Sequence, residues 1–558
     1  MKPQKLQTSG GAAHNDGEKS PEKLPAHNQE PTQFPEGMPL ALIIFSIWLA
    51  LFLCALDRTI IATVIPHIAN EFRVLDDVGW YASSYMLTNC ALQLLYGRIY
   101  KFYSTKWVFV GCVGIFEVES AVCGSAPTSL AFIIGRSIAG MGTAGIFSGS
   151  QMTLLHSVPL NRRPIYMGLF GATFGIALVV APLLGGVLTD RLSWRWCFYI
   201  NLPIGAASIV IISFILKIPD AGKSKVRGLS LQQQLLRLDP LGTAFFLPSI
   251  VCLILALQWG GTTHPWKSAR VMALLIIFVV GFIVFLGIQA WEKEDALVPL
   301  RIAMHRSIVA AAIFTFTTVG AMTVILFYLA IWFQAIKGIT AIESGIRLIP
   351  FIISLSVAST LSGFVTSKIG YYVPSMIFAS VATSVATGFM TTFNLETNHA
   401  SWIGFQVLCG LGIGSSRQVA GLAVQVVLPR SDVAIGTAAI FFAQGLGGVG
   451  FVPAAQNVFI SSLASGFIRI PGLDAQAVLN TGATDLQTSV APQYLNALLV
   501  VYNHALTRTF VLATCVASLS VIGSLSIEWK NIKDMKRGSP EDAEEAVKSE
   551  RKPEDGHS

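Results

Sequence analysis

Charged side chains inside long apolar stretches are the first candidates for chemistry in this sequence. Asp57 and Arg136 each lie within a long apolar segment. A charge at the centre of a bilayer costs about 2.5–3.5 kcal/mol on insertion scales, so each needs a reason to be there. Burial favours the protonated form of an acid, whereas a nearby Arg favours proton release. We therefore expect Asp57 to carry a proton with Arg136 as its switchable partner, and a purely structural ion pair is the alternative.

Two further acids, Glu117 and Glu119, share one apolar segment. Residues two apart on a helix point about 200° apart, so the two carboxylates cannot face the same side. We expect Glu117 to face the cavity as a secondary acid, and Glu119 to pack or to meet lipid headgroups.

Other polar residues inside apolar segments are candidates for a substrate cavity, namely Gln93, Arg417 and Gln444. Hydrogen bonds between packed helices are the alternative role for such amides. The sequence contains no His cluster, nucleophile elbow or G-x4-G-K-[ST] loop, and its eight cysteines form no C-x-x-C pair. These absences disfavour an enzyme or an ATP-driven pump, and we expect no catalytic residue, metal or cofactor.

The composition indicates what must position these residues. The chain is 53% hydrophobic and 12% charged, whereas soluble domains carry about 25% charged residues. Its mean hydropathy is +0.62, so we expect an all-α protein that crosses the bilayer many times. The net charge of +7 is explained by Lys and Arg in cytoplasmic loops and does not indicate nucleic-acid binding.

About 14 segments are long enough to span the membrane. The excess of Lys and Arg in alternate loops places both termini in the cytoplasm, and composition predicts disordered tails at 1–37 and 530–558. The longest outer loop is expected from about 462 to 508, with an interfacial helix near Leu498. The predicted spans are 40–63, 80–97, 107–126, 130–152, 165–188, 196–216, 240–258, 271–290, 308–333, 345–366, 374–393, 402–426, 434–460 and 509–528.

An internal repeat divides these segments. Gly97 matches Gly363, Gly140-x-Gly142 matches Gly410-x-Gly412, and Pro182 matches Pro453. The separation along the chain is nearly constant across the three matches, which makes a chance match less likely. Parallel repeats with a site between them are typical of secondary transporters. The repeat predicts a six-helix half at 38–216, a linker with an inserted helix pair at 217–306, and a second half at 307–529.

One stretch, from Gly168 to Gly205, carries small residues at helical spacing and an internal proline. Small faces allow two membrane helices to approach closely, and Pro182 interrupts the backbone hydrogen bonds and kinks the helix. The residues that define the pattern are Gly168, Ala177, Ala181, Pro182, Gly185 and Gly186. This pattern resembles the fifth-helix antiporter motif of the major facilitator superfamily, with alanine at two of its usual glycines.

Further motifs strengthen the resemblance over residues 40–530, and they are similar to the fungal 14-helix drug:proton antiporters. They include Leu56-Asp57-Arg58-Thr59-Ile60, Ile134-Gly135-Arg136 and Ser193-Trp194-Arg195-Trp196. The resemblance implies a major facilitator fold that exports small, largely apolar organic molecules, such as toxins, drugs or secondary metabolites, in exchange for protons. It also implies a monomer in the cell membrane, with the vacuolar membrane as the alternative.

The sequence departs from the superfamily in the loop after its second helix. The usual Asp of this gating loop aligns with Lys101, so the charge relay of the family cannot operate unchanged. We expect the gate to rest on Gly97, Arg98 and Lys106, with the two cations bonded to carbonyls at helix C-termini. A proton-coupled importer of a siderophore or nutrient is the first alternative function, and a non-transporting receptor is the second.

Overall fold

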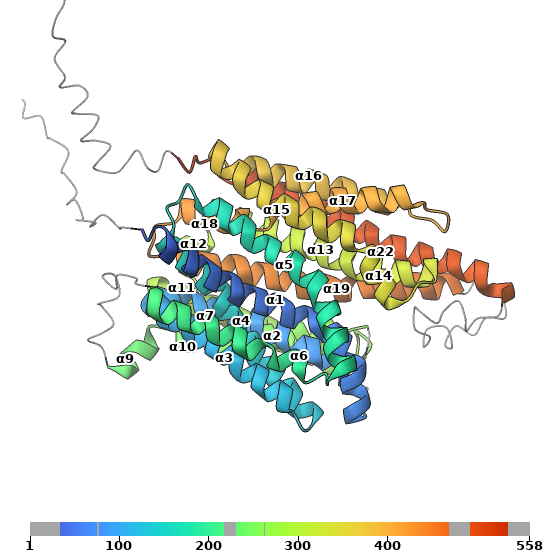
Figure 1. Cartoon of the computed structure of the whole chain (residues 1–558), viewed down its shortest axis with the longest axis horizontal. Helices are drawn as coiled ribbons and strands as arrows, with labels where there is room; N and C mark the ends of the chain where they lie inside the picture. Colours follow the sequence, from blue (N-terminus) through green and yellow to red (C-terminus); the bar gives the residue numbers. More distant parts are fainter. Residues whose placement is uncertain (1–33, 75–76, 217–229, 262, 468–491, 534–558) are drawn as a thin grey trace, which may run out of the picture. The chain divides into compact units, whose positions relative to one another are not determined.

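The computed structural model describes residues 34–74, 77–216, 230–261, 263–467 and 492–533 (Figure 1). Thirteen helices within these ranges are long and apolar enough to cross a membrane. A fourteenth, α2 (Val78–Phe102), is more polar but packs between α4 and α19, so it spans with them. The predicted all-α membrane architecture is confirmed, while most of both predicted tails lies outside the described residues.

The first half of the chain folds into six spanning units. Its strongest contacts join α2 and α3 to α4, and α1 to α5. Thr128 caps α4 by accepting a hydrogen bond from the Ala131 amide, which satisfies one orphan donor at the helix start. Besides α2, the elements are α1 (Met38–Phe72), α3 (Thr105–Ser125), α4 (Ser129–Ser157), α5 (Arg163–Arg191), α6 (Trp196–Tyr199) and α7 (Asn201–Ile215).

The second half repeats this arrangement, with α13 packed against both α19 and α22. The expected loop from 462 to 508 is wrong at both ends, because α19 continues to Phe467 and α22 already begins at Pro492. The Phe459 and Tyr502 rings pack 5.2 Å apart, so the two helices lie side by side near the place where a loop was expected. The elements are α13 (Arg306–Lys337), α14 (Ala341–Arg347), α15 (Ile349–Ile369), α16 (Val373–Met390), α17 (His399–Ser416), α18 (Val419–Val427), α19 (Val433–Phe467) and α22 (Pro492–Ser526).

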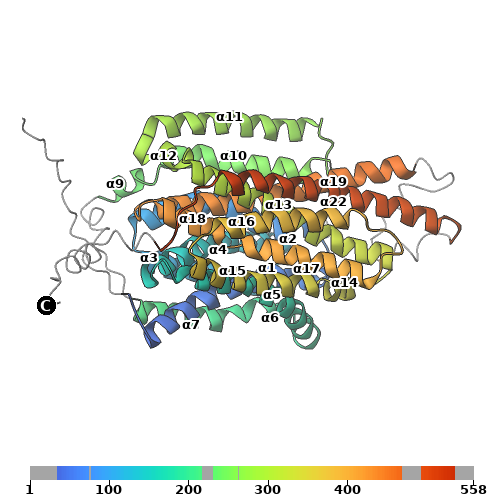
Figure 2. The ribbon, with the colours of Figure 1, turned by 90° about the horizontal axis from the view of Figure 1, so that it is seen from above.

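The inserted pair lies at one edge of the helices, with α11 outermost (Figure 2). Of the pair, α10 contacts both α2 of the first half and α19 of the second. Most side chains of α11 are exposed, as expected for a surface that faces lipid. The segment comprises α9 (Leu231–Leu236), α10 (Pro240–Trp259), α11 (Ala269–Glu292), η1 (Lys293–Asp295) and α12 (Leu300–Ala303).

The repeat is visible in the helix boundaries. In the register set by Gly140 and Gly410, α4 (Ser129–Ser157) corresponds to α17 and α18 together, from His399 to Val427. The first-half helix is continuous, whereas its counterpart breaks at Arg417–Gln418. The expected single span at 402–426 is therefore two helices.

The side-chain hydrogen bonds between the halves are concentrated at one end. We call this the tail end: α1 begins there and the described C-terminus, which pairs with Gly370, lies there (Figure 1). The side-chain hydrogen bonds between the two halves in the described ranges lie in this part of the bundle. They join Lys101 to Asp432, Gln151 to Gln418, Arg163 to Gln425, Gln425 to Gln151, Ser359 to the Gly168 carbonyl, and Ser367 to the Asn161 carbonyl.

Candidate functional site

A buried cluster of two acids and one arginine lies inside the first half. Arg136 on α4 donates from Nη1 to both carboxylate oxygens of Asp57 on α1, at 2.8 Å. The same nitrogen lies 3.1 Å from Glu119 Oε1 on α3. Arg136 is 1% exposed and both acids are 0% exposed. The two residues that the sequence analysis paired, Asp57 and Arg136, are therefore in direct contact.

The guanidinium of Arg136 is also held from other directions. Its Nε donates to the Tyr81 carbonyl at 3.2 Å, and its Cζ lies 4.8 Å from the centre of the Tyr85 ring. The Tyr85 hydroxyl donates to Thr143 at 3.0 Å, which fixes the ring. With its polar and aromatic neighbours in place, Arg136 has one orientation, and it presents the same nitrogen to two acids.

The structure places Glu119, not Glu117, in this cluster. Glu117 points the other way, against Gly205 of α7, and neither of its carboxylate oxygens has a hydrogen-bond partner among the described residues. The sequence showed that only one of the two acids could face Arg136. It could not show which one, because the rotation of α3 against α4 and α7 decides which acid faces the cluster.

The small-residue stretch on α5 contacts two different helices. Near the tail end, a Cβ on Gly168 would lie 2.5 Å from the Ser359 carbonyl oxygen on α15 of the other half. Further along, a Cβ on Gly185 would lie 2.2 Å from Thr63 Oγ1 on α1 of its own half. Ala177 and Ala181 are fully buried between these points, and a Cβ on Gly186 would meet open space. One continuous pattern in sequence thus serves two separate interfaces.

Gly97 and Gly363, which match in the repeat, make matching contacts between the halves. A Cβ on Gly97 would lie 2.7 Å from the Ala438 Cβ on α19. A Cβ on Gly363 would lie 2.3 Å from the Pro164 carbonyl oxygen on α5. Only glycine allows backbones to approach this closely, so each half contributes one close crossing to the tail end.

The cations of the expected gate loop have different partners. Arg98, which is 0% exposed, donates to the backbone carbonyls of Glu294 and Asp295, just after the end of α11. Carbonyls at a helix end were the expected partners, but they belong to the inserted segment. Lys106 instead lies over the Trp107 ring, at 5.4 Å from its centre.

A charge cluster that the sequence analysis missed completes the tail end. Asp432, between α18 and α19, accepts hydrogen bonds from Lys101 Nζ at 3.1 Å and from Arg301 Nη1 at 2.6 Å. Burial acts to raise the pKa of Asp432, but the hydrogen bonds from Arg301 and Lys101 outweigh it and hold the pKa below its usual value. Lys101, which replaces the usual acid, thus finds its acid on the opposite half.

The three candidate cavity residues differ in role. Gln93 is buried and donates to Ser148 Oγ at 2.6 Å, so it joins α2 to α4 as a packing bond. Gln444 is half-buried on α19. Arg417 is half-buried at the break between α17 and α18, with its Cζ 4.8 Å from the centre of the Phe174 ring.

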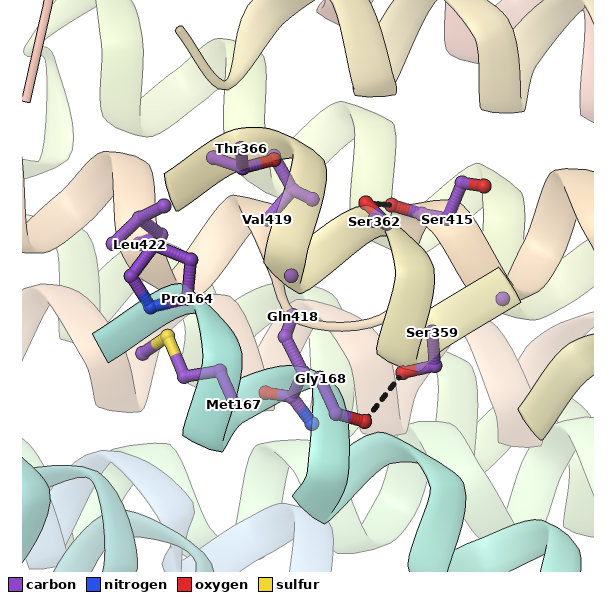
Figure 3. Close-up of a pocket in the computed structure, with 12 residues that line it drawn as sticks. Pro164, Met167, Gly168, Ser359, Ser362, Thr366, Ser415, Gln418, Val419 and Leu422 are labelled. Atoms are coloured by element: carbon purple, nitrogen blue, oxygen red, sulfur yellow. Dashed lines mark hydrogen bonds between the residues drawn. The ribbon is translucent and has the colours of Figure 1, made fainter. Parts of the chain in front are cut away.

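A small cavity lies beside this break, between α5, α15 and α17–α18 (Figure 3). Its volume of about 10 Å³ is room for roughly one water molecule and not for an organic substrate. Gln418, Ser415 and Gly168 are among its lining residues, and Ser359 donates to the Gly168 carbonyl at its edge. The cavity therefore belongs to the seal between the halves.

Comparisons with known proteins agree with this architecture. Residues 47–452 match the model of the Major Facilitator Superfamily. The chain is 48% identical over 532 residues to the MFS-type efflux pump MFS1 of Trichophyton rubrum, covering 95% of this chain and 99% of that protein. It is 46% identical over 502 residues to the rubrofusarin-specific efflux pump aurT of Gibberella zeae, covering 90% of this chain and 92% of that protein.

A solved structure of the human organic anion transporter MFSD10 has the same fold, with a TM-score of 0.56 at 12% identity, covering 86% of this chain and 100% of that chain. Two six-helix halves related by an internal repeat, with a buried charge cluster inside the first half, are the architecture of a secondary transporter. The chain belongs to the Major Facilitator Superfamily, and within it to the efflux pumps.

Proposed function

We propose that this transporter exports a small, largely apolar organic compound in exchange for protons, and that the Asp57–Arg136–Glu119 cluster carries the proton. The observation that carries the proposal is one guanidinium nitrogen shared by two acids, all three groups being almost fully buried. One cation can neutralise only one carboxylate. The cluster is neutral only when one acid holds a proton, and a buried net charge is costly.

The proton and the cargo are coupled through the position of α4. Movement of Arg136 away from Asp57 would leave an acid without its counter-charge in an apolar environment, which favours uptake of a proton. Return of the guanidinium favours its release. Asp57 is the principal carrier because it receives two of the three hydrogen bonds, and Glu119 is the second acid. Glu117, against Gly205, remains a candidate for an independent proton site.

The charge pattern supports a proposal for orientation, and the relatives support one for cargo. The positive-inside rule favours a cytoplasmic tail end, in which case the hydrogen bonds between the halves close the cytoplasmic side. The relative in Gibberella zeae is named for rubrofusarin, which supports a secondary metabolite as cargo. We propose a monomer in the cell membrane with both termini inside.

The test is proton-driven flux in proteoliposomes of the full chain. Asp57→Asn should abolish flux driven by a pH gradient and leave cargo exchange without a gradient measurable. Asp190→Asn is the matched control, since Asp190 is exposed at the far end of α5. If Asp57→Asn keeps the wild-type dependence on the gradient, the cluster is not the carrier. Inside-out vesicles test direction: uptake on acidification of the lumen supports export, and the opposite response supports the importer.

A further inference from the structure

One arginine inside the membrane has no counter-charge from the protein. Arg417 lies at the α17–α18 break of the second half. No carboxylate lies within 4.0 Å of its guanidinium, and the guanidinium makes no hydrogen bond, in the part of the chain that the structure describes. The acids of the cluster in the first half face Arg136 instead. An unpaired cation at this depth is costly and indicates a functional site.

The depth of Arg417 follows from its place in the helix. Along α18, Arg417 is about 15 Å from the helix end, which places it well inside the membrane. A negative group between the two halves would supply the counter-charge that Arg417 lacks there.

Three aromatic rings lie beside Arg417 and come from both halves. Phe174 on α5 stacks with Phe147 on α4 at 5.7 Å, and Phe147 packs with Phe441 on α19 at 5.8 Å. All three are half-buried. The guanidinium of Arg417 lies over the Phe174 ring, so the cation adjoins this row of rings. A flat apolar molecule with one charged end matches a row of rings that ends in a cation.

The helix break is an independent observation at the same place. Irregular backbone inside a membrane is tolerated where it lines a cavity or is buried in protein, and broken helices mark the binding sites of transporters. The break at Arg417–Gln418 contains no proline, and the equivalent position of the first half, Phe147, lies in a continuous helix. The second half thus departs from its own repeat at the residue that carries the unpaired charge.

We infer that the cargo of this transporter is an aromatic organic anion, whose charged group binds Arg417 and whose rings pack on Phe174, Phe147 and Phe441. The inference rests on the proposed export function and names its substrate class. A carboxylate, an ionised phenol or a sulfonate supplies the required chemistry, since each accepts hydrogen bonds from a guanidinium.

The experiment measures equilibrium binding to the purified full-length protein without any gradient. The probes are matched pairs that differ only in charge: naphthalene-2-sulfonate with naphthalene-2-sulfonamide, and anthracene-2-carboxylate with anthracene-2-carboxamide. The wild type should bind the anion of at least one pair about 10-fold more tightly than its neutral analogue, as expected for hydrogen bonds to a charged group. Equal affinity within both pairs, or no binding of either anion, would overturn the inference.

Variants assign the preference to Arg417. Arg417→Gln should remove most of the anion preference, while Arg417→Lys should retain part of it. Arg508→Gln is the matched control, because Arg508 is exposed on α22 and, among the described residues, its side chain bonds to His504. An anion preference that survives Arg417→Gln in folded protein contradicts the inference.

The same measurements separate this inference from the proposed function. If Asp57→Asn keeps the wild-type gradient-driven flux while anion binding still depends on Arg417, the proposed proton coupling is overturned and the substrate class stands. If the wild type carries a neutral compound with gradient-driven flux and shows no anion preference, the substrate class is overturned and the proton coupling stands.

Discussion

The equivalent helices of the two halves, α4 and α17–α18, carry different polar residues at matching positions of the repeat. On α4, Arg136 is surrounded by two acids, an aromatic ring and a carbonyl. The matching position of α17 in the repeat is Gln406, which is 0% exposed and has no partner for either amide atom among the described residues. At a second pair of matching positions, the second half carries the cation: Arg417 at the break matches the neutral Phe147 of α4.

This difference shows that the two halves of the repeat differ in charge while they share their backbone crossings. The first half holds a paired charge cluster, which we propose exchanges one proton, and the second half holds a cation beside aromatic rings. The two halves remain alike where the backbones cross, at Gly97 and Gly363, as the proposed rocking of one half against the other requires.

The largest expected effect comes from making the first half resemble the second. Arg136→Gln leaves Asp57 and Glu119 buried without a cation, and removing one partner of a buried ion pair costs about 3–5 kcal/mol. We expect a large fall in the unfolding temperature together with loss of proton-driven export. Thermal unfolding of purified protein measures the first effect. A variant as stable as the wild type would show that Arg136 does not stabilise the two buried acids.

The next prediction concerns the shared small-residue stretch on α5. Gly185→Leu inserts a side chain against Thr63 within the first half, and overpacking of this kind costs about 1–3 kcal/mol. We expect export to be lost while the protein still reaches the membrane. Gly186→Leu is the matched control, since a Cβ there meets open space. Normal export by Gly185→Leu at wild-type abundance would remove α1–α5 packing from the mechanism.

The charge cluster that joins the halves should have a measurable but smaller effect. Asp432→Asn removes the acid that Lys101 and Arg301 share, and loss of a hydrogen bond to a charged group costs about 1.5–3 kcal/mol. We expect the tail end to open more often, observed as faster labelling of a single cysteine introduced at Gln418. Unchanged labelling would mean that Asp432 does not hold the tail end shut and that the close contacts at Gly97 and Gly363 do so.

The pH dependence of this closure follows from the lowered pKa of Asp432. A carboxyl whose folded pKa lies below its usual value near 3.9 stabilises the structure at pH above that value. The stabilisation is lost as the pH falls through the folded pKa. The labelling rate itself falls with pH as the thiol is protonated, so the quantity to compare is the rate with Asp432 intact divided by the rate in Asp432→Asn at the same pH. This ratio should be below one and constant from pH 5 to 8, and should rise toward one only in stronger acid.

A smaller effect is expected when the unpaired amide of the second half is replaced. Gln406→Leu removes two buried polar atoms that have no partner among the described residues, and each such atom costs about 1–3 kcal/mol to bury. We expect unchanged or slightly raised thermal stability. A clear loss of stability would reveal a polar partner for Gln406 and weaken the contrast with Arg136.

The smallest effect on cargo choice is expected from the inserted pair. Ile283 is exposed on the outermost helix, α11, away from both halves. Ile283→Gln should change abundance in the membrane more than the profile of exported compounds. A switch in substrate preference at normal abundance would mean that the pair contributes to the cavity.

The sequence by itself determined the number of spans, the repeat and the pairing of Asp57 with Arg136. These follow from local quantities: apolar length sets a membrane helix, and the cost of burying a charge requires that two such residues meet. The nearly constant offset of the repeat predicted equivalent helices, and the boundaries of α4 and α17–α18 agree with it.

Only the tertiary structure decided which face each helix presents and where helices end. Glu119 rather than Glu117 meets Arg136 because of the rotation of α3, and Asp432 reaches Lys101 from the opposite half of the chain. Gln93 binds Ser148 of the neighbouring helix, and α19 and α22 extend beyond their expected ends with Phe459 packed on Tyr502. Such outcomes depend on neighbours far away in sequence, so no periodicity within one segment contains them.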